Sequence, residues 1–186
     1  GAKRNIPTLS GHENMVLGIA FSPDNKALAS TSLDKTARLW SLKSGKERLC
    51  FKGHTKAVSD VAFSPTNDFF VTASWDRTLR VWNSKSGKEL GRLIGHRDAV
   101  TSVDVANINS SIVIASGSDD NTVRLWSWSA KKGGQETRLF RVHSAPVKFV
   151  SFSPGGELLA SGSEDGTVRV FSVQAGRELL SLSGHN

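Results

Sequence analysis

FVTASWDRTLRVW, residues 70–82, is the most informative segment of this chain, because three close variants of it occur elsewhere in the sequence. The variants are LASTSLDKTARLW at 28–40, IASGSDDNTVRLW at 114–126 and LASGSEDGTVRVF at 159–171. Each copy has a Ser or Thr, an Asp four residues later and an aromatic residue that ends an alternating apolar run. A pattern that recurs in this way is typical of a repeat architecture, in which one unit packs on the next.

Histidines mark the period of this repeat. His12, His54, His96 and His143 open four units and His185 follows the last of them, at steps of 42, 42, 47 and 42 residues. Downstream of each opening histidine lies a short apolar segment that reads GIAFSP, DVAFSP, SVDVAN or FVSFSP. The four units therefore fill nearly all of the 186 residues.

The second unit illustrates how one repeat is expected to fold. Its apolar run over 58–63 ends at Ser64-Pro65, a turn signal because proline cannot donate to a strand ladder. Further strands are predicted over 69–73, 78–82 and 88–93, separated by a tight turn at Asp76 and by Ser86-Gly87. A four-stranded antiparallel meander of this kind cannot bury both faces alone, and radial stacking of such sheets gives a β-propeller.

In these features the chain resembles the WD40 repeat family. The resemblance implies an all-β propeller with four four-stranded antiparallel blades, over 12–52, 54–94, 96–142 and 143–183. Residues 1–11, with a strand from Arg4 to Leu9, would be the leading outer strand of a preceding blade. Because rings of this family commonly have about six to eight blades, two arrangements stay open. The chain is part of a larger ring, or half of an eight-bladed ring that a second copy completes.

The resemblance also implies a hydrogen-bond relay in each unit, from an Asp carboxylate through an imidazole and a hydroxyl to an indole N–H. Its members would be His12, Ser30, Asp34 and Trp40; His54, Thr72, Asp76 and Trp82; and His96, Ser116, Asp120 and Trp126. The fourth unit has His143, Ser161 and Asp165 but ends on Phe171, which has no N–H to donate. We therefore expect a shorter relay and a lower local stability in that unit.

A recurring Ser, His and Asp set also invites an enzymatic interpretation. Nucleophilic catalysis needs one activated hydroxyl beside an oxyanion hole, whereas this set recurs at matching spacing in every unit, as a fold determinant does. The sequence has no HxH, HExxH or CxxC cluster for a metal and no Gly-rich phosphate loop. We therefore expect a non-enzymatic protein without metal or cofactor.

The charge balance bears on possible partners. A net charge of +7 and a pI of about 9.9 fit an RNA, an acidic protein face or an anionic surface. The basic residues are spread over the units, and we expect Arg38, Arg80, Arg124 and Arg169 to keep their charged heads solvated. With the single cysteine Cys50 and no apolar run near the roughly 20 residues of a membrane span, we expect an intracellular, cytoplasmic or nuclear protein without membrane insertion.

Two sets of positions map, by resemblance, to the narrower face around the central channel of the propeller, where a partner would bind. One set lies just before the turn Asp and the other just after the first Val of the opening strand. They are Leu33, Trp75, Asp119 and Glu164, and Leu17, Ser59, Thr101 and Lys148. Trp75 is the leading anchor, since a Trp in a tight turn exposes an aromatic surface. The alternative interpretation is that Trp75 packs against the neighbouring blade.

The sequence therefore predicts a scaffold or sensor module that binds a protein or peptide through this face, with self-association as a further way to complete the ring. The alternative is a ribosome- or RNA-associated scaffold, suggested by the pI and by SWDRTLRVW, which resembles a repeat of the receptor for activated C kinase. The third unit is longer than the others. We expect its extra residues in turns, with the stretch around Lys131-Lys132-Gly133-Gly134 as an extended solvent loop.

Overall fold

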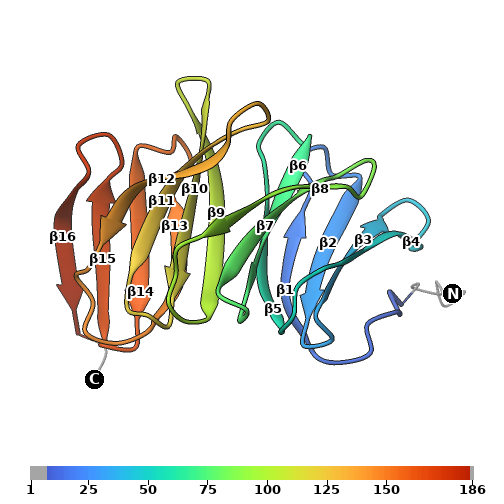
Figure 1. Cartoon of the computed structure of the whole chain (residues 1–186), viewed down its shortest axis with the longest axis horizontal. Helices are drawn as coiled ribbons and strands as arrows, with labels where there is room; N and C mark the ends of the chain where they lie inside the picture. Colours follow the sequence, from blue (N-terminus) through green and yellow to red (C-terminus); the bar gives the residue numbers. More distant parts are fainter. Residues whose placement is uncertain (1–7, 185–186) are drawn as a thin grey trace, which may run out of the picture.

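A computed structural model describes residues 8–184, which form sixteen strands in four sheets (Figure 1). Each sheet is an antiparallel meander of four strands that are consecutive in the sequence. The sheets comprise β1 (Val16–Phe21), β2 (Ala27–Ser32), β3 (Thr36–Ser41) and β4 (Glu47–Lys52); β5 (Val58–Phe63), β6 (Phe69–Ser74), β7 (Thr78–Asn83) and β8 (Glu89–Ile94); β9 (Val100–Ile108), β10 (Ser111–Ser118), β11 (Val123–Ser129) and β12 (Gly133–Phe140); and β13 (Val147–Phe152), β14 (Leu158–Ser163), β15 (Thr167–Ser172) and β16 (Arg177–Ser183). The all-β, WD40-type propeller architecture predicted from the repeats is confirmed, and the sheets are its blades.

The second sheet follows the sequence pattern closely. Its four strands begin and end within one residue of the predicted bounds, and Thr72 at the centre of β6 pairs with Val61 on one side and Arg80 on the other. The tight turn after Asp76 places Arg77 at a φ of 73°, a conformation that turns accommodate and strands do not. The strand expected from Arg4 to Leu9 lies mostly outside the described residues, and its last two positions belong to no strand.

The hydrophobic core lies between neighbouring blades. At each of the three junctions, the middle strands of one blade pack against the innermost strand and the relay aromatic of the next. The junction between the second and third blades buries, from the former, Val71, Leu79, Val81 and Leu93 and, from the latter, Val100, Val103, Ile114 and Trp126. Because each such side chain contributes about 1.5–3 kcal/mol when fully buried, stacking is the main source of stability.

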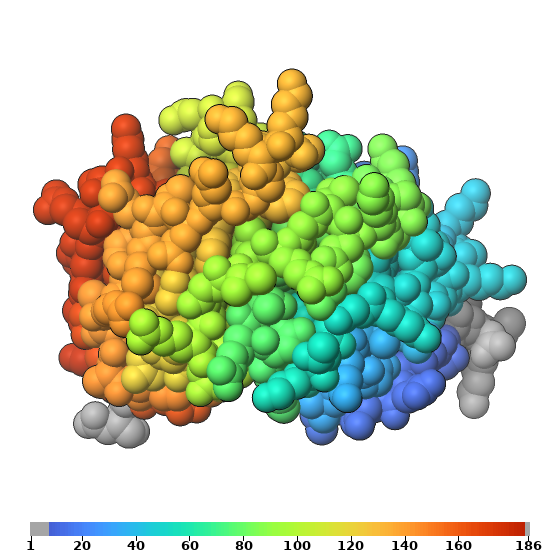
Figure 2. All heavy atoms as spheres, in the orientation of Figure 1, coloured from blue at the N-terminus to red at the C-terminus, as the bar shows by residue number. Residues whose placement is uncertain are grey.

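The extra length of the third unit does not lie where the sequence suggested. β9 has nine residues and β10 has eight, against six in the corresponding strands of the other blades, so the additions lengthen strands. The expected solvent loop is likewise wrong, because β11 continues to Ser129 and β12 already begins at Gly133. The two lengthened hairpins project together from one end of the molecule (Figure 2). The physical reason is that both hairpins continue the antiparallel ladder, which satisfies backbone groups that a loop would leave to solvent.

The four arginines near the ends of the third strands correct another expectation. Arg80 and Arg124 are buried, and Arg38 and Arg169 are half-buried, so their heads are not fully solvated. Each guanidinium forms an ion pair with a glutamate of the neighbouring outer strand; the partners are Glu47, Glu89, Glu136 and Glu178. The pairing removes four cations from the surface that an acidic partner would meet.

The two end blades leave an apolar face uncovered. In the first blade Ile19 is 63% exposed, whereas its equivalents Val61 and Val103 are 4% exposed because a preceding blade covers them. In the fourth blade Leu182 is 54% exposed, whereas its equivalent Leu93 is 1% exposed. At the internal junctions, a surface equivalent to the exposed face of the first blade packs against one equivalent to the exposed face of the fourth blade. The two open ends of the chain therefore have matching apolar surfaces.

Candidate functional site

The hydrogen-bond geometry within each blade fixes the turns that carry the candidate binding residues. In the second blade His54 Nδ1 lies 2.8 Å from Asp76 Oδ2, and His54 Nε2 lies 2.8 Å from Thr72 Oγ1, which also accepts the Trp82 indole N–H at 2.9 Å. Asp76 accepts two further backbone N–H bonds, from Thr55 and Thr78, both at 3.0 Å. The first and third blades hold the corresponding four residues in the same contacts: His12, Ser30, Asp34 and Trp40, and His96, Ser116, Asp120 and Trp126.

These contacts decide the charge state of the relay carboxylates. Burial acts to raise the pKa of Asp76, but the hydrogen bonds from His54, Thr78 and Thr55 outweigh it and hold that pKa well below its usual range. The pKa values of Asp34, Asp120 and Asp165 are lowered against burial in the same way. Burial lowers the pKa of His96. The carboxylates are therefore ionised at neutral pH and act as fixed acceptors for the turn.

The fourth blade replaces the Trp of the relay and also the glycine that precedes the relay histidine. His143 contacts Asp165 at 2.9 Å and Ser161 at 2.7 Å, but Phe171 stands where the indole would be. In the second blade a Cβ on Gly53 would come within 3.2 Å of the Trp82 ring, so a glycine is needed there. In the fourth blade that position is Val142, which packs with Phe171 in the same apolar cluster. The smaller aromatic and the larger neighbour compensate each other.

Both sets of candidate binding positions have a backbone device that aims them at one face. In β1, β5, β9 and β13 the ladder register shifts at the second residue, so that this residue is the extra one of a β-bulge; the four are Leu17, Ser59, Thr101 and Lys148. The turn residues are tied to the segment just before the same innermost strand, as in the 3.0 Å bond from the Trp75 N–H to the Ala57 carbonyl. Bulge and turn residues of each blade therefore lie side by side.

Six of the eight candidates line one hollow of about 400 Å³ on this face. They are Leu17, Ser59, Trp75, Thr101, Asp119 and Lys148. Glu164 joins the hollow through Lys148, whose Nζ lies 2.8 Å from Asp119 and 3.1 Å from Glu164. Leu33 is half-buried and does not line it. Trp75 is 43% exposed, so a partner can reach this residue.

The polar groups of the hollow differ in how far they are engaged. Ser59 donates its hydroxyl to the Val100 carbonyl at 2.6 Å, and Thr101 donates to the Val147 carbonyl at 2.6 Å, so both join neighbouring blades. Burial acts to lower the pKa of Lys148, but its hydrogen bonds with Asp119 and Glu164 outweigh burial and raise it. The hollow therefore offers an aromatic surface and a charged triad, and its hydroxyls serve mainly to fix the blades.

Sequence reasoning missed the residues that follow the bulges. Asp60, Ser102 and Phe149 also line the hollow, each as the third residue of its innermost strand. Asp60 Oδ2 accepts from the Val103 N–H at 2.9 Å and from the Ser102 hydroxyl at 3.0 Å, which ties the second blade to the third, and burial raises its pKa. The signal was present, because a carboxylate in an otherwise apolar strand needs a specific partner.

Comparison with known proteins identifies the class and then the family. The fold is a WD40-type propeller: a solved structure titled "Structure of U3-55K" superposes with a TM-score of 0.84 at 24% identity over 96% of this chain and 54% of that one. "Crystal structure of RRP9 WD40 repeats" gives 0.84 at 24% identity over 95% and 53%. The family model "WD domain, G-beta repeat" matches residues 3–41, 45–83, 87–127 and 134–172, so the chain belongs to the WD40 repeat family.

Curated relatives match over about one repeat each. Lissencephaly-1 homolog 1 of Paramecium tetraurelia is 50% identical over 44 residues, which are 24% of this chain and 11% of the relative. Periodic tryptophan protein 2 homolog of Mus musculus is 51% identical over 39 residues, which are 21% of this chain and 4% of that protein. The chain thus spans about half the length of the solved propellers and aligns with only a small part of these relatives.

The family and the described residues also bear on catalysis, metal binding and membrane insertion. WD40 repeat proteins are generally non-enzymatic scaffolds, and the described residues contain no group of three or more His, Cys, Asp or Glu side chains placed to hold a metal. Within residues 8–184 there is no helix long and apolar enough to cross a membrane.

Proposed function

We propose that this chain is a scaffold module that binds a protein or peptide through its central face, with Trp75 as the anchor. The observation that carries the proposal is that residues from all four blades reach one hollow around an exposed Trp. Trp is enriched among interface residues that dominate binding energy, because it buries a large rigid surface and keeps one polar N–H. Lys148, flanked by two carboxylates, adds a charge pattern that a partner must complement.

Selection of displayed peptides against the purified chain tests this proposal. A peptide chosen for binding should lose at least tenfold in affinity for Trp75→Ala, because truncation of an anchor residue commonly costs 2 kcal/mol or more. Leu42→Ala is the matched control, since Leu42 is comparably exposed and lies outside the hollow. Peptides that bind Trp75→Ala and Lys148→Ala as well as the unaltered chain would reject the central face as the binding site.

A role as an RNA-associated scaffold is the second candidate, favoured by the net charge of +7. Four arginines are already paired with glutamates, and Lys148 is paired with Asp119 and Glu164. Within residues 8–184, Lys131 and Lys132 remain as two adjacent exposed basic residues. Binding of a labelled single-stranded RNA should then weaken as salt rises and on charge reversal of these two lysines. Lack of binding even at low salt would exclude this candidate.

Completion of the ring belongs to the same proposal. The uncovered faces at Ile19 and Leu182 are those that pack together within the chain, so further WD40 blades or a second copy are suited to cover them. The lone Cys50 supports an intracellular location, cytoplasmic or nuclear.

A further inference from the structure

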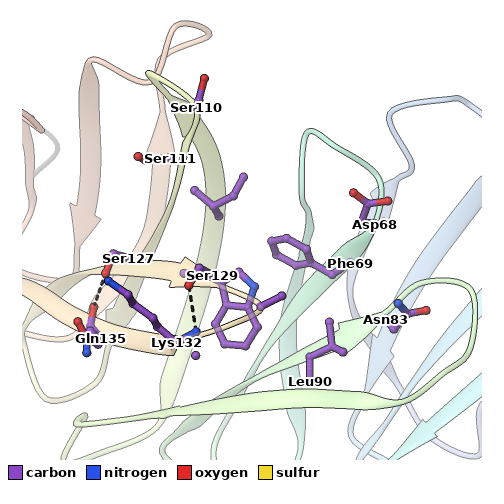
Figure 3. A pocket seen from close by; sticks show the side chains of 14 residues that line it. Asp68, Phe69, Asn83, Leu90, Ser110, Ser111, Ser127, Ser129, Lys132 and Gln135 are labelled. Atoms are coloured by element: carbon purple, nitrogen blue, oxygen red, sulfur yellow. Dashed lines mark hydrogen bonds between the residues drawn. The ribbon is translucent and has the colours of Figure 1, made fainter.

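A second hollow lies between the second and third blades, away from the residues of the central face (Figure 3). It has a volume of about 660 Å³, and its apolar surface comes from Phe69, Leu90, Ile112 and Trp128. Figure 3 shows Phe69 and Leu90 on one side and Ser127, Ser129 and Lys132 on the other. A volume of this size falls within the roughly 300–1,000 Å³ typical of ligand pockets.

Both additions to the third unit line this hollow. Ser110, Ser111 and Ile112 come from the lengthened β9–β10 hairpin, and Trp128, Ser129 and Lys132 come from the lengthened β11–β12 hairpin. The corresponding space between the first and second blades, next to Ala27, Arg48 and Ser84, measures only about 90 Å³. The two insertions, which are separate in the sequence, thus line a cavity much larger than the corresponding space at the neighbouring junction.

Trp128 brings an unsatisfied donor to this cavity. The indole N–H groups of Trp40, Trp82 and Trp126 each donate to a relay hydroxyl, but Trp128, only 6% exposed, forms no hydrogen bond with any described residue. Among the described residues, the side-chain atoms that are both fully enclosed and without a hydrogen-bond partner are four arginine Nε atoms. The Trp128 nitrogen also has no partner but is not one of these enclosed atoms, so it is still accessible. A donor on a side chain that is buried to this extent normally has a partner, and a molecule in the cavity can provide the acceptor.

The rim of the cavity defines the chemistry of that molecule. Asn83, Gln135 and four serines offer neutral donors and acceptors, while Asp68 on one wall and Lys132 on the other cancel in charge. This balance complements a ligand without net charge and disfavours a polyanion, even though the whole chain carries +7. The backbone amides of an extended peptide can donate to and accept from these neutral rim groups, while an apolar side chain of the peptide contacts the floor.

We propose that this cavity, which we call the blade 2–3 pocket, binds a peptide segment of no net charge. A large aliphatic side chain of the segment occupies the floor formed by Phe69, Leu90 and Trp128, and a backbone carbonyl accepts the Trp128 indole N–H. The site is independent of the central face, because the two hollows share no residue.

The test uses the peptide acetyl-Lys-Gly-Leu-Gly-Glu-amide and the indole N–H resonances of the ¹⁵N-labelled chain. Trp128→Phe identifies the Trp128 resonance and removes the donor while keeping an aromatic ring against Phe69. We expect a saturable shift of the Trp128 resonance, about fivefold weaker binding to Trp128→Phe, and at least tenfold weaker binding when Ala replaces the peptide Leu. Leu90→Ser changes an exposed residue of the pocket floor. It should weaken binding without changing the melting temperature by more than a few degrees.

Several outcomes overturn the proposal. The absence of a saturable shift up to 10 mM peptide, on the order of the weakest useful affinity, would do so, as would equal binding by Trp128→Phe and Leu90→Ser. A shift confined to Trp75, abolished in Trp75→Ala, would assign the peptide to the central face. Equal affinity for acetyl-leucinamide would mean that the pocket takes a small apolar molecule and makes no use of a peptide backbone.

Discussion

Asp76→Asn is the substitution that most directly measures how much the relay stabilises a blade. Asp76 Oδ2 accepts from His54 Nδ1–H and the Thr55 N–H, while Oδ1 accepts from the Thr78 N–H and the Thr78 hydroxyl at 2.6 Å. Asn keeps the shape but replaces one oxygen with an NH₂ group, so two of the four donors lose their acceptor. Each hydrogen bond to a charged group contributes about 1.5–3 kcal/mol, so the loss of two should lower the unfolding free energy by about 3–6 kcal/mol.

Urea unfolding at pH 7, followed by circular dichroism, gives this difference directly if the transition is two-state. Asp68→Asn is the control, because Asp68 is exposed and accepts a hydrogen bond only through its backbone carbonyl among the described residues. Since the folded pKa of Asp76 is lowered, its contribution is present above the unfolded pKa of about 4 and is lost as pH falls through the folded value. The difference in unfolding free energy between the unaltered chain and Asp76→Asn should therefore narrow below about pH 4. A difference under about 1 kcal/mol at pH 7 would refute the reasoning.

Three further predictions concern the fourth blade and the open ends. Phe171→Trp alone should destabilise the chain by about 1–3 kcal/mol through overpacking, whereas combination with Val142→Gly should recover most of that loss by restoring an indole donor to Ser161; additive effects in the double-mutant cycle would contradict this coupling. Amides of β14 and β15 should exchange faster than those of β2 and β3, which also belong to an end blade but keep the indole donor; equal protection would count against a weaker fourth blade. Light scattering at micromolar concentration should give a mass above the 20.0 kDa of the monomer, and Ile19→Lys should restore the monomer; a monomeric unaltered chain would show that open blade faces are tolerated.

Much of the fold could be predicted because each unit contains its own local signals. The strand bounds of the second unit depend on alternation and on turn residues within a dozen positions, and all four units repeat them. The positions of the arginine heads could not be predicted in this way. Arg80 is buried by Glu89 of the adjacent outer strand and by the blade stack, and the arginine stem alone is equally compatible with a solvated head.

The two hollows also differ in how far the sequence predicts them. The central face combines equivalent positions of every blade, so that a bulge at Ser59 implies bulges at Thr101 and Lys148, and knowledge of one repeat places residues in all four. The blade 2–3 pocket depends on features that occur once: two insertions meet across the sheet, and Trp128 has Leu42 and Ser84 as its equivalents. A repeat pattern carries no information about such a site, because the pattern is what the blades share. For that reason departures from the repeat, in unit length and in single side chains, are where specificity should be sought in a WD40 chain.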